Sequence, residues 1–195
     1  MAADFVSRYM NDLDRLLGET DLEAVGRVGE LLWDAYLNDR TIFIIGNGGS
    51  AATASHMACD LGKGATVAGK RRLRVMSLTD NVAWMTAIGN DIGYEKLFTE
   101  QLANLAAPGA LLVAFTASGN SPNILDALRW AKEKDMVSIA VLGFDGGAAA
   151  GLADLPLVFR SRNYGLVEDA HLILEHALSQ WLRQRIEAEG APDNS

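Results

Sequence analysis

Two side chains able to exchange protons stand four residues apart in this chain. His56 and Asp60 lie within a helix predicted over residues 51–64, so they share one helix face and can converge on a single ligand. The chain has three histidines, and the other two lie on a helix predicted over residues 167–186. All imidazole groups of the protein are therefore carried by two helices.

The second of these helices offers two pairings. Glu168 precedes His176 by eight residues, a little over two turns, so the two side chains lie on neighbouring faces about two turns apart in height. His171 and Glu175 are four residues apart and can form an ion pair on a solvated face of the same helix. Around the helix axis, His171 and Glu175 lie at smaller angles from Glu168 than His176 does. Helical periodicity alone therefore does not identify His176 as the partner of Glu168.

A strand and a glycine-rich turn must position the first helix. Residues 42–45 are apolar and mostly β-branched, which predicts a strand buried on both faces, as in parallel sheets covered by helices. The Gly-Asn-Gly-Gly-Ser that follows allows a close backbone turn, and its serine can cap the next helix. A helix start of this kind binds anions, and phosphate is the expected guest. The candidate binding residues are Asn47, Gly48, Gly49 and Ser50.

A second turn repeats this arrangement. Residues 110–115 predict a buried strand, and residues 124–134 predict a helix. Between them lies a turn rich in hydroxyl groups, with Thr116, Ser118, Asn120 and Ser121 as further candidates. Hydroxyls and backbone N–H groups without a dedicated cation suit a phosphate monoester on a small molecule.

The two turns also fit other interpretations. The first turn also matches the dinucleotide pattern Gly-x-Gly-x-x-Ala, but no strand ends in an acidic residue at the usual distance, and the hydroxyl cluster has no role in a dinucleotide site. No Gly-Lys-Ser/Thr occurs, so a Walker-type phosphate loop is absent from the sequence. In the alternative interpretation, Ser118 and Ser121 merely cap a helix and fill a turn, and contact no ligand.

The alternation of strands and helices predicts an α/β fold, a five-stranded parallel sheet flanked by helices. Two amphipathic helices precede it, and we interpret residues 1–38 as a helical hairpin for oligomerisation, since its apolar stripe needs a partner. Residues 39–187 then form the α/β core and residues 188–195 a polar tail, all within a single domain spanning 1–195.

Composition excludes several classes of protein. With 49% hydrophobic and 22% charged residues, the chain fits an ordinary globular domain. A net charge of -8 argues against a nucleic-acid partner. No apolar run reaches membrane-spanning length and the N-terminus lacks a signal-peptide pattern, so we expect a cytoplasmic protein without a membrane partner. The single cysteine, Cys59, fits a reducing compartment and is expected to be a small core residue.

Several motifs together resemble the sugar isomerase (SIS) family, in particular its phosphoheptose isomerase branch. They are the Gly-Asn-Gly-Gly-Ser turn followed by His56, the pair Asn90 and Asp91, the Ser-Gly-Asn-Ser turn, and the last helix, which reads Glu-Asp-Ala-His-Leu-Ile-Leu-Glu-His from Glu168 to His176. The resemblance implies a flavodoxin-like fold, a homotetramer with active sites between subunits, and conversion of sedoheptulose 7-phosphate to glycero-manno-heptose 7-phosphate. Asn90 and Asp91 would then contact substrate, although Asp91 can equally be a turn residue.

The resemblance also implies catalytic and metal-binding residues. Asp60 would be the base and His176 the acid or a metal ligand, while His56, Asp60, Glu168 and His176 would hold one zinc per subunit, with Glu168 also touching substrate. Such mixed imidazole and carboxylate ligands suit a Lewis-acid metal. The family usually has Glu at the position of Asp60, Gln at that of Glu168, and Asp at that of Gly165, so this chain departs from its pattern three times.

Three functions compete at this point. An isomerase would act through an enediol, with a base that moves a proton between adjacent carbons. A SIS tetramer can instead be a non-catalytic interaction protein, similar to the factor that binds the bacterial replication initiator. A third interpretation is a sensor that binds a phosphosugar without turnover.

Overall fold

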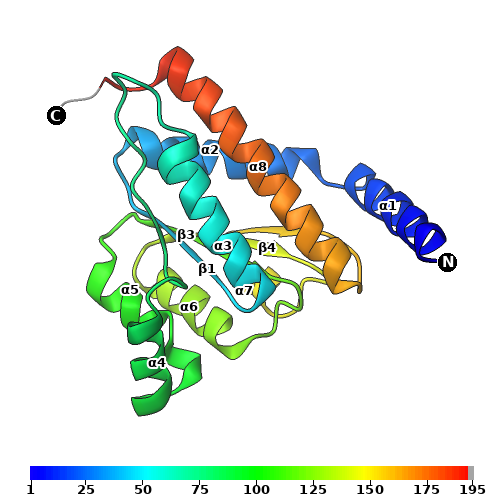
Figure 1. Ribbon diagram of the computed structural model, residues 1–195. Coiled ribbons are helices and arrows are strands. Elements are labelled where there is room, and N and C mark those ends of the chain that lie inside the picture. The colour runs from blue at the N-terminus through cyan, green and yellow to red at the C-terminus, as the bar shows by residue number, and fades with distance from the viewer. Residues whose placement is uncertain (193–195) are drawn as a thin grey trace.

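The computed structural model describes residues 1–192, and its centre is one parallel sheet (Figure 1). The five strands are β1 (Ile42–Gly46), β2 (Val75–Ser77), β3 (Leu111–Thr116), β4 (Val137–Leu142) and β5 (Leu155–Val158). They are arranged in the order β2-β1-β3-β4-β5, and every neighbouring pair is parallel. The predicted five-stranded parallel sheet is therefore confirmed.

The sheet has its switch point between β1 and β3. From β1 the chain moves outward to β2 on one side, then returns to place β3 on the other side. Every residue of β1 and β3 is buried, as the continuous apolar runs predict. Because both strands point the same way, the glycine turn after β1 and the hydroxyl turn after β3 meet at one edge, where ligands of such sheets bind.

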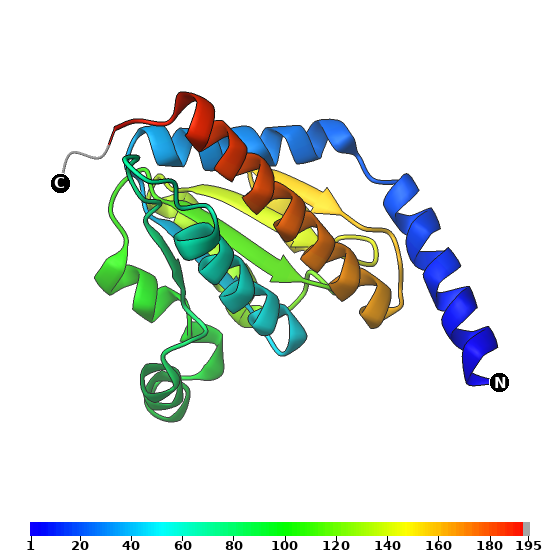
Figure 2. The ribbon, with the colours of Figure 1, turned by 45° about the horizontal axis from the view of Figure 1, so that its top comes forward.

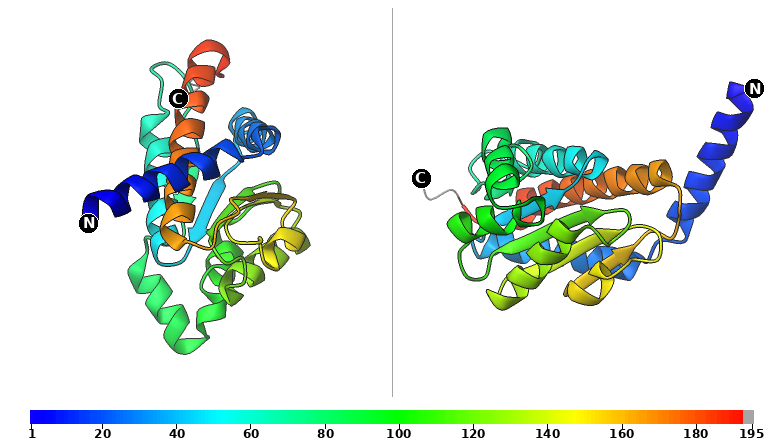
Figure 3. Two further views of the ribbon diagram at one scale, coloured as in Figure 1. Left: turned by 90° about the vertical axis from the view of Figure 1, so that its right-hand side faces the viewer. Right: turned by 90° about the horizontal axis from the view of Figure 1, so that it is seen from below.

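Helices cover both faces of the sheet (Figures 1 and 3). One face carries α2 (Leu22–Leu37), α3 (Gly49–Cys59) and α8 (Tyr164–Glu189), which share a buried apolar cluster with the sheet. The second apolar cluster, on the opposite face, includes α4 (Val82–Asp91), α5 (Thr99–Leu105), α6 (Pro122–Glu133) and the short α7 (Ala149–Leu152). A single 3₁₀ turn, Tyr94–Lys96, separates α4 from α5. Figures 1 and 2 show α3 and α8 side by side, and this pair carries the candidate site.

The two N-terminal helices do not form the predicted hairpin. Helix α2 packs against α8 and β5, and its Leu32, Trp33 and Tyr36 belong to the core, so its apolar stripe is satisfied within this chain. Helix α1 (Ala2–Gly18) instead packs against α8, and its N-terminal end projects away from the body (Figure 2). Its Phe5 and Met10 are 61% and 63% exposed. Helix α1 therefore offers exposed apolar side chains to another copy.

Helix α3 differs from prediction at both ends. It begins at Gly49, with Gly48 as the N-cap residue, so Ser50 lies inside the first turn and does not cap the helix as predicted. At its other end the α-helix stops at Cys59, and Asp60–Gly64 form a π-helical turn in which the Ala65 N–H donates to the Asp60 carbonyl. Such wide turns often occur at functional sites.

The C-terminal segment is more ordered than the predicted polar tail. Helix α8 runs to Glu189, and beyond it the Tyr36 hydroxyl donates to the Ala191 carbonyl. Lys70 donates to the carbonyl of Gly190, which is buried. The predicted tail therefore packs on the protein up to residue 192, and residues 193–195 lie outside the described residues. Within residues 1–192, no helix combines the length and apolar character needed to cross a bilayer.

Candidate active site

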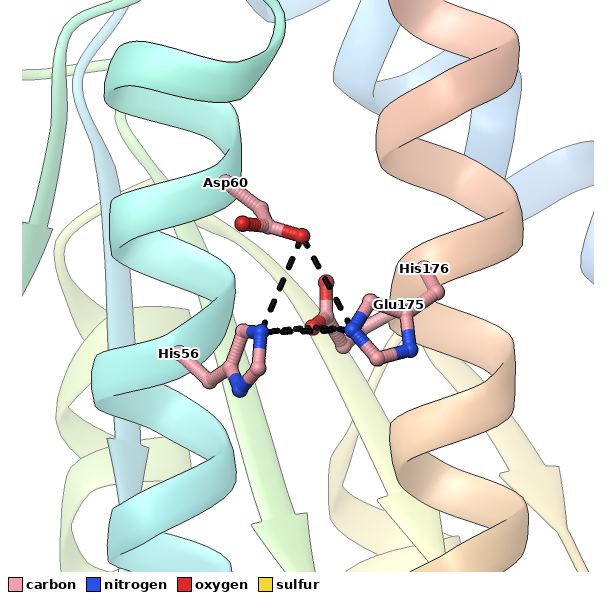
Figure 4. Close-up of side chains that lie close together, drawn as sticks. All are labelled: His56, Asp60, Glu175 and His176. Carbon is pink, nitrogen blue, oxygen red and sulfur yellow. Dashed lines mark hydrogen bonds and ion pairs between the residues drawn. The ribbon is translucent and has the colours of Figure 1, made fainter.

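Two histidines and two carboxylates meet between α3 and α8 (Figure 4). His56 comes from α3 and Asp60 from the start of the π turn, while Glu175 and His176 come from α8. The two Nε2 atoms lie 3.2 Å apart, and the Asp60 Oδ2 lies 3.8 Å from that of His56 and 3.9 Å from that of His176. The structure thus brings together three of the predicted site residues, His56, Asp60 and His176.

Glu175 forms the inner wall of this cluster. Its side chain is completely buried, whereas those of His56 and His176 are 46% and 41% exposed. The Glu175 Oε1 lies 3.6 Å from the Nε2 of His56 and 3.5 Å from that of His176, and neither carboxylate oxygen has a hydrogen-bond partner among residues 1–192. Burial, with a smaller effect of the Asp60 charge, raises the pKa of Glu175 to about 7.

The set of four fits a divalent metal ion. Two imidazoles and two carboxylates are ligands that zinc accepts in proteins, and their donor atoms all lie within 4.8 Å of one another. A buried carboxylate that lacks a hydrogen bond is stabilised either by a proton or by a nearby positive charge, and a metal ion would supply the positive charge. Glu168, the predicted fourth ligand, does not belong to this cluster.

A small pocket of 140 Å³ opens where the two turns meet. Its lining combines the glycine turn, the hydroxyl turn and the start of α8, and includes Asn47, Ser50, Thr116, Ser118, Ser121, Tyr164 and Glu168. Glu168 lies close to Gly49, at the N-terminus of α3, where a Cβ on Gly49 would collide with its carboxylate. The predicted convergence of the two turns is therefore observed, and Glu168 faces this pocket rather than the histidines.

Some predicted phosphate ligands have a structural role in the turn. The Thr116 hydroxyl is buried and accepts a hydrogen bond from the Gly119 N–H. The Asn120 amide donates to the Ser118 carbonyl and accepts from the Ala148 N–H. Ser118 and Ser121 line the pocket and are half-buried, and Ser121 is the N-cap residue of α6 without a side-chain cap. The two serines are thus the hydroxyls of this turn best placed to meet a ligand.

An amide pair that sequence reasoning missed links the two turns. Asn123 is completely buried, and it exchanges two hydrogen bonds with Asn47, at 2.8 and 2.9 Å. The Tyr94 hydroxyl donates to the same Asn47 oxygen at 3.2 Å. The signal in the sequence was an asparagine directly after the proline that begins α6. Asn47 is therefore held in place from two sides.

Two further predicted residues lie apart from the pocket. Asn90 and Asp91 are exposed at the end of α4, where the Asn90 amide donates to the Asp91 carboxylate. Neither lines the pocket at the two turns. Their contact with substrate stays a prediction.

Two sequence expectations about buried and exposed positions are wrong. His171 and Glu175 do not form an ion pair on a solvated face, because both are completely buried where α8 packs on the sheet. The His171 ring lies between Phe115 and Phe159, and burial lowers its pKa to about 4. Cys59, expected in the core, is exposed because it lies on the solvent side of α3.

Gly165, where the resemblance implies an aspartate, lies beneath α1. A Cβ at this position would come within 2.7 Å of the Tyr9 hydroxyl oxygen. That hydroxyl donates to Asp169 at 2.7 Å, and burial together with this acceptor raises the pKa of Tyr9 to about 12. Glycine at 165 thus makes room for the contact between α1 and α8.

Comparison with known proteins agrees with this arrangement. The SIS domain model matches residues 6–143. The chain is 38% identical over 183 residues to a lincomycin biosynthesis protein of Streptomyces lincolnensis, covering 89% of this chain and 66% of that protein. It is 36% identical over 173 residues to a phosphoheptose isomerase of Geotalea daltonii, covering 89% and 90% of the two chains.

Solved structures give the same result. The phosphoheptose isomerase of Neisseria gonorrhoeae superimposes with a TM-score of 0.81 at 32% identity, covering 94% of this chain and 96% of that one. That of Francisella tularensis gives a TM-score of 0.88 at 26% identity, covering 94% and 99%. The chain therefore belongs to the SIS domain family, in the branch that contains the phosphoheptose isomerases.

Proposed function

We propose that this protein is a ketose–aldose isomerase that converts sedoheptulose 7-phosphate to glycero-manno-heptose 7-phosphate, at the start of nucleotide-activated heptose synthesis. The observation that carries the proposal is a phosphate-type pocket and a cluster of proton-transfer groups on the same two helices, α3 and α8. The relatives named phosphoheptose isomerase support the same reaction.

The spacing along the two helices suits a long sugar. Ser50 and His56 are six residues apart on α3, so the helical rise separates their backbone positions by about 9 Å along the helix axis. On α8, Glu168 and His176 are separated by about 12 Å in the same way. An extended chain with carbon–carbon bonds of about 1.5 Å spans roughly 9 Å from the C7 phosphate to C2. A seven-carbon sugar phosphate anchored at the turns can therefore present C1 and C2 to the histidines.

Asp60 and His176 have suitable places for the chemistry. Asp60 is the proposed base that moves a proton between C1 and C2, and its carboxylate reaches the cluster although it is one methylene shorter than a glutamate. His176 is the proposed acid for the sugar oxygens. His56, Asp60 and His176 would hold the proposed zinc ion, which would supply Lewis-acid stabilisation of the negative charge on those oxygens.

The proposal includes assembly and location. We expect a homotetramer in the cytoplasm, with active sites between subunits. Phe5, Val6 and Met10 of α1 form an exposed apolar stripe that an assembly would bury. Light scattering of the full chain and of a Phe5→Asp variant tests this part, and a monomeric wild-type protein would contradict it.

The reaction itself is tested by NMR. Protein with and without added zinc is mixed with sedoheptulose 7-phosphate, and formation of the aldose is followed. Asp60→Asn is expected to abolish turnover, whereas the exposed Glu133→Gln serves as a matched control with full activity. No aldose above the blank in either condition would refute the isomerase, and calorimetric binding without turnover would favour a sensor.

A further inference from the structure

We propose that Glu175, and not Glu168, is the fourth protein ligand of a divalent metal ion held by His56, Asp60 and His176. The inference rests on the metal site within the proposed function, but it is independent of the sugar that the protein converts. It assigns a coordinating role to a residue that the resemblance did not indicate.

The first argument is geometric. Four donors around zinc at about 2.0–2.1 Å in a tetrahedron lie roughly 3.3 Å from one another. In the cluster the two histidine Nε2 atoms are 3.2 Å apart, and the Glu175 Oε1 lies 3.5 and 3.6 Å from them. The Asp60 Oδ2 lies 3.8 and 3.9 Å from the same atoms. Of the two carboxylates, Glu175 thus comes nearer to the ideal spacing.

The second argument is the burial of Glu175. Both carboxylate oxygens lack a hydrogen-bond partner among residues 1–192, and the side chain has no exposed surface. Leaving a buried carboxylate without a partner costs several kcal/mol, so proteins pair such groups with cations or metals. The groups that face it are the two imidazole rings and the Asp60 carboxylate (Figure 4). A divalent ion between these groups would give Glu175 the positive partner it lacks.

The third argument is the position of Glu168. Its carboxylate lies beside Gly49 at the start of α3 and lines the pocket at the turns. On α8 it stands seven residues before Glu175, which places it about 10 Å further along the helix axis. Glu168 is not among the side chains whose donor atoms gather around the two histidines, and its carboxylate faces the pocket at the turns instead.

The partly exposed histidines leave the cluster open to solvent. With Glu175 behind the ion, a sugar oxygen approaches from the solvent side of His56 and His176. Zinc sites accommodate such an additional ligand by expanding to five-coordinate geometry. The arrangement therefore binds a metal from the inside and a substrate from the outside.

Metal binding of two variants tests the assignment. Metal-free wild type, Glu175→Gln and Glu168→Ala are titrated with Zn²⁺ by competition with a chelating dye, and their Co²⁺ absorption spectra are recorded. Alanine is used at position 168 because the glutamine that the family usually has there could itself bind the metal. Glu175→Gln is expected to weaken Zn²⁺ affinity by more than about 100-fold, beyond the effect of losing a residue that only supports a ligand, and to change the Co²⁺ spectrum. Glu168→Ala is expected to weaken it by less than about tenfold and to keep the spectrum.

Each outcome of the titration either supports or overturns the assignment of Glu175 as a metal ligand. Equal affinity of Glu175→Gln and wild type overturns the assignment, as does a 100-fold loss in Glu168→Ala. Circular dichroism of both metal-free variants checks their fold, and if Glu175→Gln fails to fold, the Glu168→Ala titration still decides. A wild type that binds no Zn²⁺ overturns this inference while leaving the NMR assay to decide the isomerase.

Discussion

The burial of His171 predicts a pH-dependent term in stability that one substitution removes. Its ring lies 5.7 Å from the Phe115 ring and 5.6 Å from the Phe159 ring, measured between centroids, with no exposed surface. Burial lowers its pKa from the ordinary 6.5 to about 4, and a nearby backbone group of Leu142 opposes this only in part. The imidazole is therefore neutral in the folded protein at pH values where the unfolded chain is already protonated.

The sign and size of this pH dependence follow from the difference between the pKa values of the folded and unfolded states. A pKa that is lower in the folded state stabilises the protein above pH 6.5, and this contribution disappears as the pH falls from 6.5 to about 4. Since each pKa unit corresponds to about 1.4 kcal/mol, the loss amounts to about 3 kcal/mol. Glu175, with its pKa raised to about 7, contributes stability below pH 4.5 that is lost as the pH rises toward 7. The two terms oppose each other in the wild type.

The comparison of His171→Leu with wild type isolates the histidine term. Urea unfolding of both metal-free proteins at one protein concentration, at several pH values from 7 to 4, gives the difference in unfolding free energy. The advantage of His171→Leu is expected to grow by about 3 kcal/mol as the pH falls across this range. Ile139→Val, a core substitution without a titrating group, should cost about 1 kcal/mol at every pH. A His171→Leu advantage that is the same at pH 7 and pH 4 would refute the reasoning.

Three other predictions concern the turns. Ser118→Ala removes a hydroxyl from the pocket and should raise KM for the phosphorylated sugar about tenfold with little change in kcat. The reason is that one hydrogen bond to a charged group contributes about 1.5–3 kcal/mol. Initial rates measure this effect, and an unchanged KM would argue against phosphate at this turn. Gly49→Ala should displace the Glu168 carboxylate and lower turnover without lowering the unfolding temperature, as thermal unfolding and the NMR assay would show, whereas full activity would contradict it. Gly119→Ala should cost about 3 kcal/mol in urea unfolding, because φ is +65° and its Cβ would collide with a backbone carbonyl of the loop after β4; a cost below about 1 kcal/mol would contradict the described packing.

The strands and the pocket at the two turns were predictable because they depend on local signals. The apolar run 42–45 and the run before Thr116 are buried on both faces, which leaves a parallel sheet as the natural arrangement. The turns after these strands then meet wherever the strands are neighbours. His56 and Asp60 converge because four residues bring them to one face of a helix.

The buried position of Glu175 was not predictable, because burial along α8 does not follow the hydrophobicity of the residues. This helix packs against α1, α2 and α3, and its His171 ring contacts Phe115 of the sheet, so its buried face does not follow one apolar stripe. Ile173 is 42% exposed while His171 and Glu175 are buried, the reverse of what residue type indicates. Only the tertiary structure shows which polar side chains face inward.

The hydroxyl turn after β3 and the loop after β4 form a single backbone unit. The Ala149 N–H donates to the Gly119 carbonyl, and the Gly143 N–H donates to the Ala117 carbonyl. The Ala148 N–H donates to the side-chain oxygen of Asn120. A ligand that enters this turn meets a surface whose conformational entropy was already lost during folding. Phosphate association should therefore be fast and require no loop closure, and substitutions in the β4 loop, which touch no substrate, should slow it by loosening the turn.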